Sequence, residues 1–310
     1  MRITNSLMSQ SFLSNLNKNS NSVFRYQEQL SSMKQVNRPS DDPLRVSKIL
    51  DLKNEIKQNQ QYKTTISDSI DFTNVQDSAL DSMTSSLQRI YTLTQQAANG
   101  TFNTDDRQAI KAEIMSEVET MVDSLNTNFG GRYIFGGQAS SDKPFSVNKE
   151  NGGFELVFNN PDGAPNGNVS KKIGRGVMVE LQTDGAKLFN AFTDDGGNAQ
   201  DLNALFSDLF QALDSDDTEA LGGRLLSGVD RAINNTVNQR TNIGAIQNRL
   251  IAARDRNEAE YLNLETTRST TEDIDLAETF MKYSMQMVSY QASLNMGTRI
   301  LQTNILDYVR

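Results

Sequence analysis

The last part of the chain carries a bulky residue at every seventh position, and this repeat constrains the fold more than any other feature. The repeat comprises Phe280, Met287, Leu294, Leu301 and Tyr308, with a companion column four residues earlier at Leu276, Tyr283 and Tyr290. A strict seven-residue spacing is typical of helices that wind around one another in a left-handed supercoil. We therefore expect another segment of the chain or another subunit to cover this terminal helix.

The N-terminal segment offers a matching apolar stripe. It consists of Phe12, Leu16, Val23, Tyr26, Leu30 and Met33. From Val23 onward the steps are three, four and three residues, as in the core positions of a coiled coil. The two ends are expected to pair, with neighbouring subunits covering what remains exposed. The candidate assembly interface is Leu16, Val23, Tyr26, Leu30, Phe280, Met287, Leu294 and Leu301.

Two long helical regions lie between these ends. Asp42 and Pro43 predict the start of the first of these helices. Its clearest coiled-coil seam, a row of positions spaced three and four residues apart, is Leu80, Met83, Leu87, Ile90, Thr94 and Ala97. Asn99-Gly100 predicts its end with a left-handed cap. Thr104 is the predicted N-cap of a second helix whose apolar face comprises Ile110, Ile114, Val118, Met121, Val122, Leu125 and Phe129, with Gly130-Gly131 ending it.

Helical patterns return after residue 200. Leu202, Leu205, Leu209 and Leu213 predict one helix. Asp216 to Glu219 predicts the capped start of a long helix that reaches about Thr267, and Ser269 to Glu272 predicts the capping box of the last helix.

The centre of the chain differs in composition from both flanks. Gly, Asn, Asp and Pro cluster at residues 159–163 and 166–167, and these residue types favour turns. The runs Phe154-Leu156-Phe158 and Val177-Val179-Leu181 alternate with the period of a strand. We predict a mainly α fold with long antiparallel helices or a coiled coil from both termini and a small β-rich inserted domain. Its predicted parts are a terminal coiled coil (1–43 with 275–310), a helical bundle (44–137 with 200–274) and an outer insert (138–199).

Composition excludes several classes of function. The 310 residues have a net charge of -9 and contain no Cys, His or Trp. Catalysis that needs an imidazole or a thiolate is therefore excluded, as are disulfides and zinc–thiolate sites. The acidic balance argues against a nucleic-acid partner, and no apolar run is long enough for a membrane span. The start of the chain lacks the pattern of a secretory signal, so export without a cleaved signal is expected. No enzyme activity, cofactor or metal is predicted.

Four polar motifs have a structural interpretation that outweighs a chemical one. Asp41-Asp42 is read as a turn and helix cap rather than a catalytic pair. The segment 130–137 is read as a glycine-flanked hinge, because it lacks the residues of a phosphate-binding loop. Asp194 to Asn198 does not have the calcium-loop pattern, and Lys171, Lys172 and Arg175 are read as a solvated face. The methionines Met281, Met285, Met287 and Met296 fit either an adaptable binding surface or a core.

Ordered motifs at both ends resemble the bacterial flagellin family. They are Arg38-Pro39-Ser40-Asp41-Asp42-Pro43, Gln96-Ala97-Ala98-Asn99-Gly100-Thr101, Gly244-Ala245-Ile246-Gln247-Asn248-Arg249-Leu250, Glu272-Asp273-Ile274-Asp275-Leu276-Ala277 and Gln291-Ala292-Ser293-Leu294. Within the family, Gly131-Arg132-Tyr133-Ile134-Phe135-Gly136-Gly137 resembles the hook–filament junction branch. The start Met1-Arg2-Ile3-Thr4 and the ending Tyr308-Val309-Arg310 are also similar to that branch.

The resemblance implies a structural subunit of the bacterial flagellum at the hook–filament junction. It implies a terminal coiled coil near the filament axis, a helical domain around it and a β-rich outer domain. It also implies secretion through the flagellar type III apparatus. The implied partners are hook-associated protein 1, flagellin, copies of the chain in a ring and an export chaperone. We expect the ends to order on assembly. Two alternatives stay open, namely flagellin itself and a binding module carried by the insert.

Overall fold

The fold is mainly α, with short antiparallel strand pairs in the middle of the chain, and this confirms the predicted fold class. In this computed structural model the described residues are 5–100, 102–138, 140–148, 154–159, 167–189, 192–193 and 199–300. The chain divides into two compact units, a terminal unit (Met1–Gln60 with Ala259–Arg310) and a central unit (Gln61–Glu258). The predicted three-part division stays a prediction.

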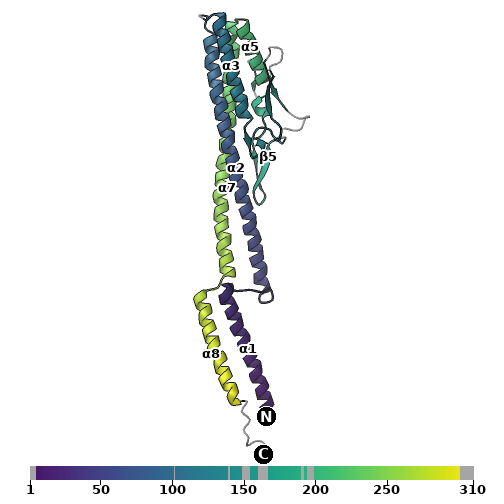
Figure 1. Cartoon of the computed structure of the whole chain (residues 1–310), viewed down its shortest axis with the longest axis vertical. Coiled ribbons are helices and arrows are strands. Elements are labelled where there is room, and N and C mark those ends of the chain that lie inside the picture. The colour runs from purple at the N-terminus through teal and green to yellow at the C-terminus, as the bar shows by residue number, and fades with distance from the viewer. Residues whose placement is uncertain are drawn as a thin grey trace, which may run out of the picture. The chain divides into compact units, whose positions relative to one another are not determined.

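The helices begin and end close to the predicted positions. They are α1 Asn5–Ser32, α2 Pro43–Ala97, α3 Thr104–Leu125, α4 Ala186–Phe189, α5 Leu202–Asp214, α6 Thr218–Ala220, the π-helix η3 Leu221–Leu225, α7 Leu226–Glu272 and α8 Leu276–Ile300 (Figure 1). Pro43 opens α2 as predicted, because the Asp42 carboxylate accepts a hydrogen bond of 3.0 Å from the Arg45 N–H. No helix in the described ranges is long and apolar enough to cross a membrane.

The described strands form four separate antiparallel pairs. The pairs are β1 Asn128–Phe129 with β2 Arg132–Tyr133, β3 Phe145–Asn148 with β4 Glu155–Phe158, β5 Val169–Gly174 with β6 Val177–Leu181, and β7 Phe192–Thr193 with β8 Ala199–Gln200. The strands predicted from the runs Phe154-Leu156-Phe158 and Val177-Val179-Leu181 are confirmed as β4 and β6, with Phe154 just before the start of β4. The Asp194 to Asn198 loop lies outside the described residues, and so do parts of the predicted turns at 159–163 and 166–167.

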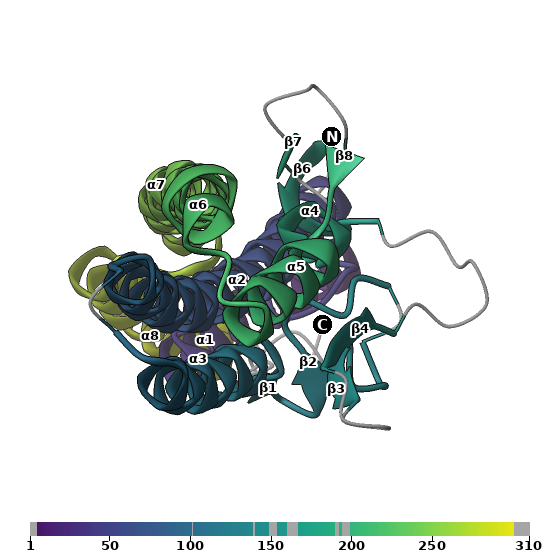
Figure 2. The same cartoon turned by 90° about the horizontal axis from the view of Figure 1, so that it is seen from above.

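The core of the central unit forms where α2, α3, α5 and α7 pack together. Every member of the predicted α2 seam from Leu80 to Ala97 is at most 1% exposed. The apolar face of α3 and the leucines of α5 are buried against it. Figure 2 shows α3 and α5 side by side, with β3 and β4 next to them.

The strand pairs do not have a core of their own. Phe135, Phe145 and Leu156 belong to the same buried cluster as the α2 seam. The Gln76 amide of α2 donates hydrogen bonds to the carbonyls of Ile134 (3.3 Å) and Gln182 (2.6 Å). The insert is therefore fixed to the helices by shared burial and by buried polar contacts.

The end of α2 differs from the prediction. Neither Asn99 nor Gly100 has the positive φ of a left-handed cap. Instead the buried guanidinium of Arg107 donates to the carbonyls of Ala97 (3.2 Å) and Asn99 (3.4 Å) and pairs with Asp216 at 3.0 Å. A side chain from α3 thus satisfies carbonyls at the end of α2 in place of a left-handed cap.

Two other helix boundaries are shifted from their predicted positions. The N-cap of α3 is Asn103 rather than Thr104, because Asn103 and Asp106 form a capping box. The α3 helix ends at Leu125, and Gly130 and Gly131 have positive φ in the β1–β2 turn.

The helical region after α5 is interrupted. Asp217 rather than Asp216 is the N-cap of α6. Asp216 has a φ of 54° and holds Arg107. The predicted single helix is divided, because η3 separates α6 from α7.

The buried α2 seam predicts a large cost for truncation. Leu87→Ala removes a side chain that is 0% exposed, and we expect it to lower the free energy of unfolding by about 2–5 kcal/mol. Chemical denaturation followed by circular dichroism measures this. The matched control is Val237→Ala on α7, where the side chain is 43% exposed and the expected change is below about 1 kcal/mol. Equal losses in the two variants would contradict the assignment of the core.

Candidate functional site

The terminal unit pairs the first and last described helices, α1 and α8, as antiparallel neighbours (Figure 1). On each helix a set of buried or half-buried positions recurs in steps of three and four. On α1 these are Phe12, Leu16, Asn19, Val23, Tyr26 and Leu30. On α8 they are Thr279, Tyr283, Gln286, Tyr290, Ser293 and Gly297. This is the heptad spacing of a coiled-coil seam, so the four predicted α1 residues of the interface lie along the contact with α8.

The predicted column on α8 does not form that contact. Phe280 is 59% exposed and Leu294 is 42% exposed, whereas Met287 is half-buried. Leu301 and Tyr308 lie outside the described residues. The seam contains Tyr283 and Tyr290 of the companion column, while Leu276 of that column is exposed.

Small residues explain why this side of α8 faces α1. The ring of Phe12 packs against Gly297, where an added Cβ would lie 2.4 Å from the ring atom Cζ. The side chains of Thr279 and Ser293, on the same side of α8, are also small. The backbones can approach closely here, and a larger side chain at Gly297 would force them apart.

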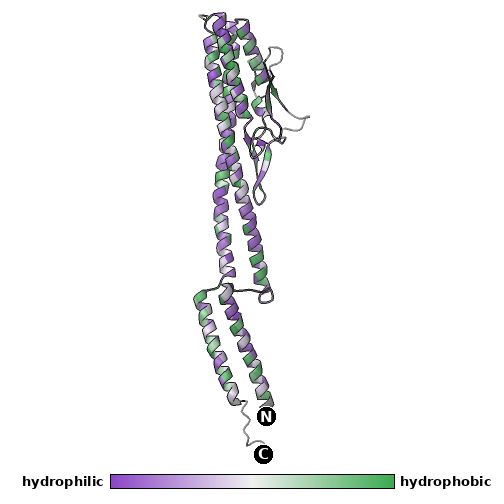
Figure 3. Cartoon of the chain, in the orientation of Figure 1, coloured by the Kyte–Doolittle hydropathy of each residue, from purple (hydrophilic) through white to green (hydrophobic). Residues whose placement is uncertain are grey.

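The pair leaves much of its apolar surface in solvent. The exposed large apolar residues on these helices are Leu7, Met8, Leu13 and Phe24 of α1 and Leu276, Phe280, Met281, Met285, Val288, Leu294 and Met296 of α8. Figure 3 shows hydrophobic positions along both helices. The 25-residue α8 contains three charged residues, Glu278, Lys282 and Arg299. Such a surface marks an interaction site.

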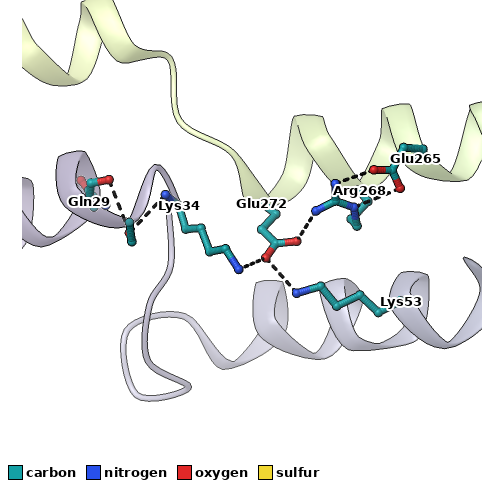
Figure 4. Close-up of polar contacts among 7 residues, drawn as sticks. Gln29, Lys34, Lys53, Glu265, Arg268 and Glu272 are labelled. Atoms are coloured by element: carbon teal, nitrogen blue, oxygen red, sulfur yellow. Dashed lines mark hydrogen bonds and ion pairs between the residues drawn. The ribbon is translucent and has the colours of Figure 1, made fainter. Parts of the chain in front are cut away.

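A buried carboxylate lies where these helices connect to α2 and α7 (Figure 4). The side chain of Glu272 is 3% exposed and pairs with Lys34 at 2.7 Å, Lys53 at 2.8 Å and Arg268 at 2.8 Å. Arg268 also pairs with Glu265 at 2.6 Å. One carboxylate thus binds cations from the α1–α2 connection, from α2 and from α7.

Backbone hydrogen bonds join the same two connections. The Gln35 N–H donates to the Glu272 carbonyl at 2.7 Å, and the Ile274 N–H donates to the Met33 carbonyl at 3.2 Å. Glu272 was predicted to cap the last helix, and this is wrong because α7 extends to Glu272. The Asp275 carboxylate caps α8 instead, accepting from the N–H groups of Ala277 and Glu278.

The charges around Glu272 change its acidity. Burial alone would raise the pKa of this carboxyl, but hydrogen bonds from Lys34, Lys53 and Arg268 outweigh it and lower the pKa from 4.5 to about 2. Because the folded-state pKa is the lower one, the cluster stabilises the terminal unit fully above about pH 4.5. That contribution is lost as the pH falls toward 2.

The motifs that suggested chemistry have structural partners. Asp41 accepts a hydrogen bond from the Arg38 N–H at 3.2 Å, as expected for a turn. Lys172 lies over the ring of Tyr62, 5.8 Å from its centroid. In the described part of the chain, His, Cys, Asp and Glu form no group of three or more that could hold a metal ion.

The Glu272 cluster predicts a pH-dependent difference between two proteins. We expect Glu272→Gln to lower the free energy of unfolding at pH 7 by roughly 2 kcal/mol, since half-exposed lysines regain water and reduce the loss. The difference from the unaltered chain should shrink between pH 5 and pH 2, where the native carboxylate becomes protonated. Urea unfolding followed by circular dichroism across this range measures it.

Glu265→Gln is the matched control, with the same chemical change two turns earlier on α7. Its partner Arg268 keeps the bond to Glu272, so a smaller loss is expected. A Glu272→Gln difference that stays constant from pH 5 to pH 2 would contradict the account.

Comparison with known families agrees with this geometry. Residues 3–140 match the bacterial flagellin N-terminal helical region, and residues 226–309 match the bacterial flagellin C-terminal helical region. The two matches cover more than half of the chain and include both helices of the terminal pair.

Individual relatives come from more than one branch. Flagellar hook-associated protein 3 of Escherichia coli (strain K12) is 27% identical, over 94% of this chain and 95% of that protein. Flagellin of Bacillus subtilis (strain 168) is 26% identical, over 100% of both chains. The crystal structure of flagellar hook-associated protein 3 from Legionella pneumophila has a similar fold, with a TM-score of 0.61 at 14% identity. It covers 71% of this chain and 97% of that chain.

These relatives are structural proteins of the flagellum. The paired terminal helices, the matched N- and C-terminal regions and the relatives along the full length agree with one another. The chain belongs to the bacterial flagellin family.

Proposed function

We propose that this chain is a structural subunit that joins the flagellar hook, through hook-associated protein 1, to the flagellin filament. The observation that carries the proposal is the apolar, weakly charged outer surface of the α1–α8 pair. Relatives named flagellar hook-associated protein 3, from Escherichia coli and Salmonella typhimurium, support the junction position over other places in the flagellum.

The proposed mechanism is assembly through the terminal helices. Leu16, Val23, Tyr26 and Leu30 pair α1 with α8, while Phe280, Met287 and Leu294 contact neighbouring subunits. Leu301, outside the described residues, belongs to the same predicted interface. Each large side chain that a neighbour covers contributes about 1.5–3 kcal/mol. Several such contacts per subunit offset the loss of freedom when the ends become ordered in the assembly.

The remaining parts follow the three-part division. The terminal coiled coil lies in the wall of a ring made of copies of the chain, the helical bundle surrounds it and the insert decorates the outside. Before assembly the chain binds an export chaperone and is secreted through the flagellar type III apparatus. The mature protein is extracellular and performs no catalysis.

Two alternatives make different predictions. A filament subunit is supported by the similarity to flagellin of Bacillus subtilis, and the purified chain would then polymerise into long filaments without a partner. A binding module is supported by a cavity of about 290 Å³ in the central unit, lined by Phe72, Phe129, Arg132 and Lys171 among others. Because the insert shares its core with the helices, a search for ligand-induced thermal stabilisation must use the whole chain.

A charge on the outer face of α8 tests the assembly role. Leu294→Asp places a carboxylate where the proposal requires apolar contact, and the exposed position tolerates it in the free chain. In cells that express this variant alone, we expect at least about tenfold fewer filaments per hook. Electron microscopy counts them, and an immunoblot of the medium measures released flagellin.

Gln291→Asp is the control, because it places the same charge one turn earlier at an exposed polar position. Circular dichroism of both purified proteins checks that the central unit still folds. Normal filament numbers with Leu294→Asp would refute the assigned face, and equal loss with Gln291→Asp would show that any charge on α8 is harmful.

A further inference from the structure

The side of α8 that faces α1 is less apolar than the side that faces solvent. Thr279, Gln286, Ser293 and Gly297 lie in the seam, together with two tyrosines. The exposed residues on the other side of α8 include Phe280, Met281, Met285 and Val288. The helix as a whole contains few charged residues. If burial of apolar area alone decided the arrangement, α8 would turn its other side toward α1. Specific contacts must therefore hold it in the observed orientation.

Asn19 makes the first of these contacts. Its side-chain nitrogen donates to the Ser293 hydroxyl at 2.9 Å, and its side-chain oxygen accepts from the Gln286 amide at 3.1 Å. Asn19 is half-buried at a core position of the heptad, between Leu16 and Val23. A polar side chain at such a position is known to specify register at a cost in stability.

The second contact is the Phe12 ring against Gly297. The two contacts oppose slippage in different directions. A slide of one heptad that places Asn19 between Ser293 and Ile300 leaves Gln286 without its partner. The opposite slide keeps polar partners for Asn19 but brings Tyr290 to Phe12 in place of Gly297, where there is no room for a large side chain.

We infer that the Asn19–Gln286–Ser293 hydrogen bonds and the Phe12–Gly297 contact together fix both the register and the rotation of α8 against α1. These five residues are the specificity determinants of the terminal pair. Their effect is to keep the more apolar side of α8 outward, where a partner reaches it. The inference concerns the pair in its ordered state, and it rests on the proposed function, in which the ends become ordered on assembly.

The absence of cysteine in the sequence permits a direct test. Tyr26→Cys with Tyr283→Cys reports the observed orientation, because both positions lie in the seam. Tyr26→Cys with Met285→Cys reports a rotated α8, because Met285 lies only two residues after Tyr283 but on the exposed side of the helix. Flagella are isolated from cells that express each pair, so that the ends are in their ordered state. Mild oxidation, non-reducing electrophoresis and an immunoblot then give the fraction of the chain that carries an intramolecular disulfide.

With no other substitution in the seam, the cysteine pair at 26 and 283 should cross-link at least about tenfold more than the pair at 26 and 285. The reason is that Cα atoms more than about 7 Å apart do not form a disulfide. The ratio of these two cross-linked fractions is the quantity measured. Asn19→Leu with Gln286→Leu should bring the ratio toward one. The control is Asn17→Leu with Gln291→Leu, which makes the same changes at exposed positions of the same helices and should leave the ratio unchanged.

A high ratio that persists in Asn19→Leu with Gln286→Leu would overturn the inference, as would a ratio near one in the unaltered seam. If that variant is not incorporated into flagella, Gly297→Ala answers the same question from the other contact. It should lower the ratio, and Phe12→Ala should restore it. No change with Gly297→Ala would also overturn the inference.

Discussion

The terminal unit depends on one buried carboxylate. Glu272 binds Lys34, Lys53 and Arg268 at 2.7–2.8 Å, and its own backbone carbonyl holds the α1–α2 connection. The chain enters and leaves the terminal pair at this point, so both connections are fixed together. Because the cluster consists of charges rather than apolar contacts, it leaves the apolar side chains of α1 and α8 free for other surfaces. An apolar core at this position would have required some of the same residues.

The terminal pair and the central unit differ in how far they bury their apolar side chains. In the central unit the long helices and the strands bury their apolar faces in two clusters that helices and strands share. In the terminal pair a seam with Asn19, Gln286 and Ser293 is retained, and Phe280, Met281 and Met285 stay exposed. Under the proposed function, the chain exists alone before it joins an assembly, and it then needs both arrangements, one for its own stability and one for its partners.

Much of the fold could be predicted from the sequence because helical periodicity is a local signal. The α2 seam, the α3 face from Ile110 to Leu125 and the strand at Val177–Leu181 are correct for that reason, whereas Phe129, predicted on the same face, lies in β1. The inward side of α8 was not predictable in the same way, since periodicity marks the most apolar side and the structure buries another. The ion pairs of Arg107 and Glu272 were not predicted, because they involve partners from elements that are distant in the sequence. Asn19 could have been noticed as a polar residue within a heptad seam, and the role of the outer face stays a prediction.

The most direct test of the account uses cells that lack this gene. Electron microscopy of their hooks, with an assay for flagellin in the growth medium, separates the possible roles. A junction subunit predicts bare hooks and flagellin released into the medium, because the filament protein is exported but finds no acceptor. Bare hooks with no flagellin anywhere would contradict the junction role and identify the chain as the filament subunit, and normal filaments would contradict any essential role in assembly.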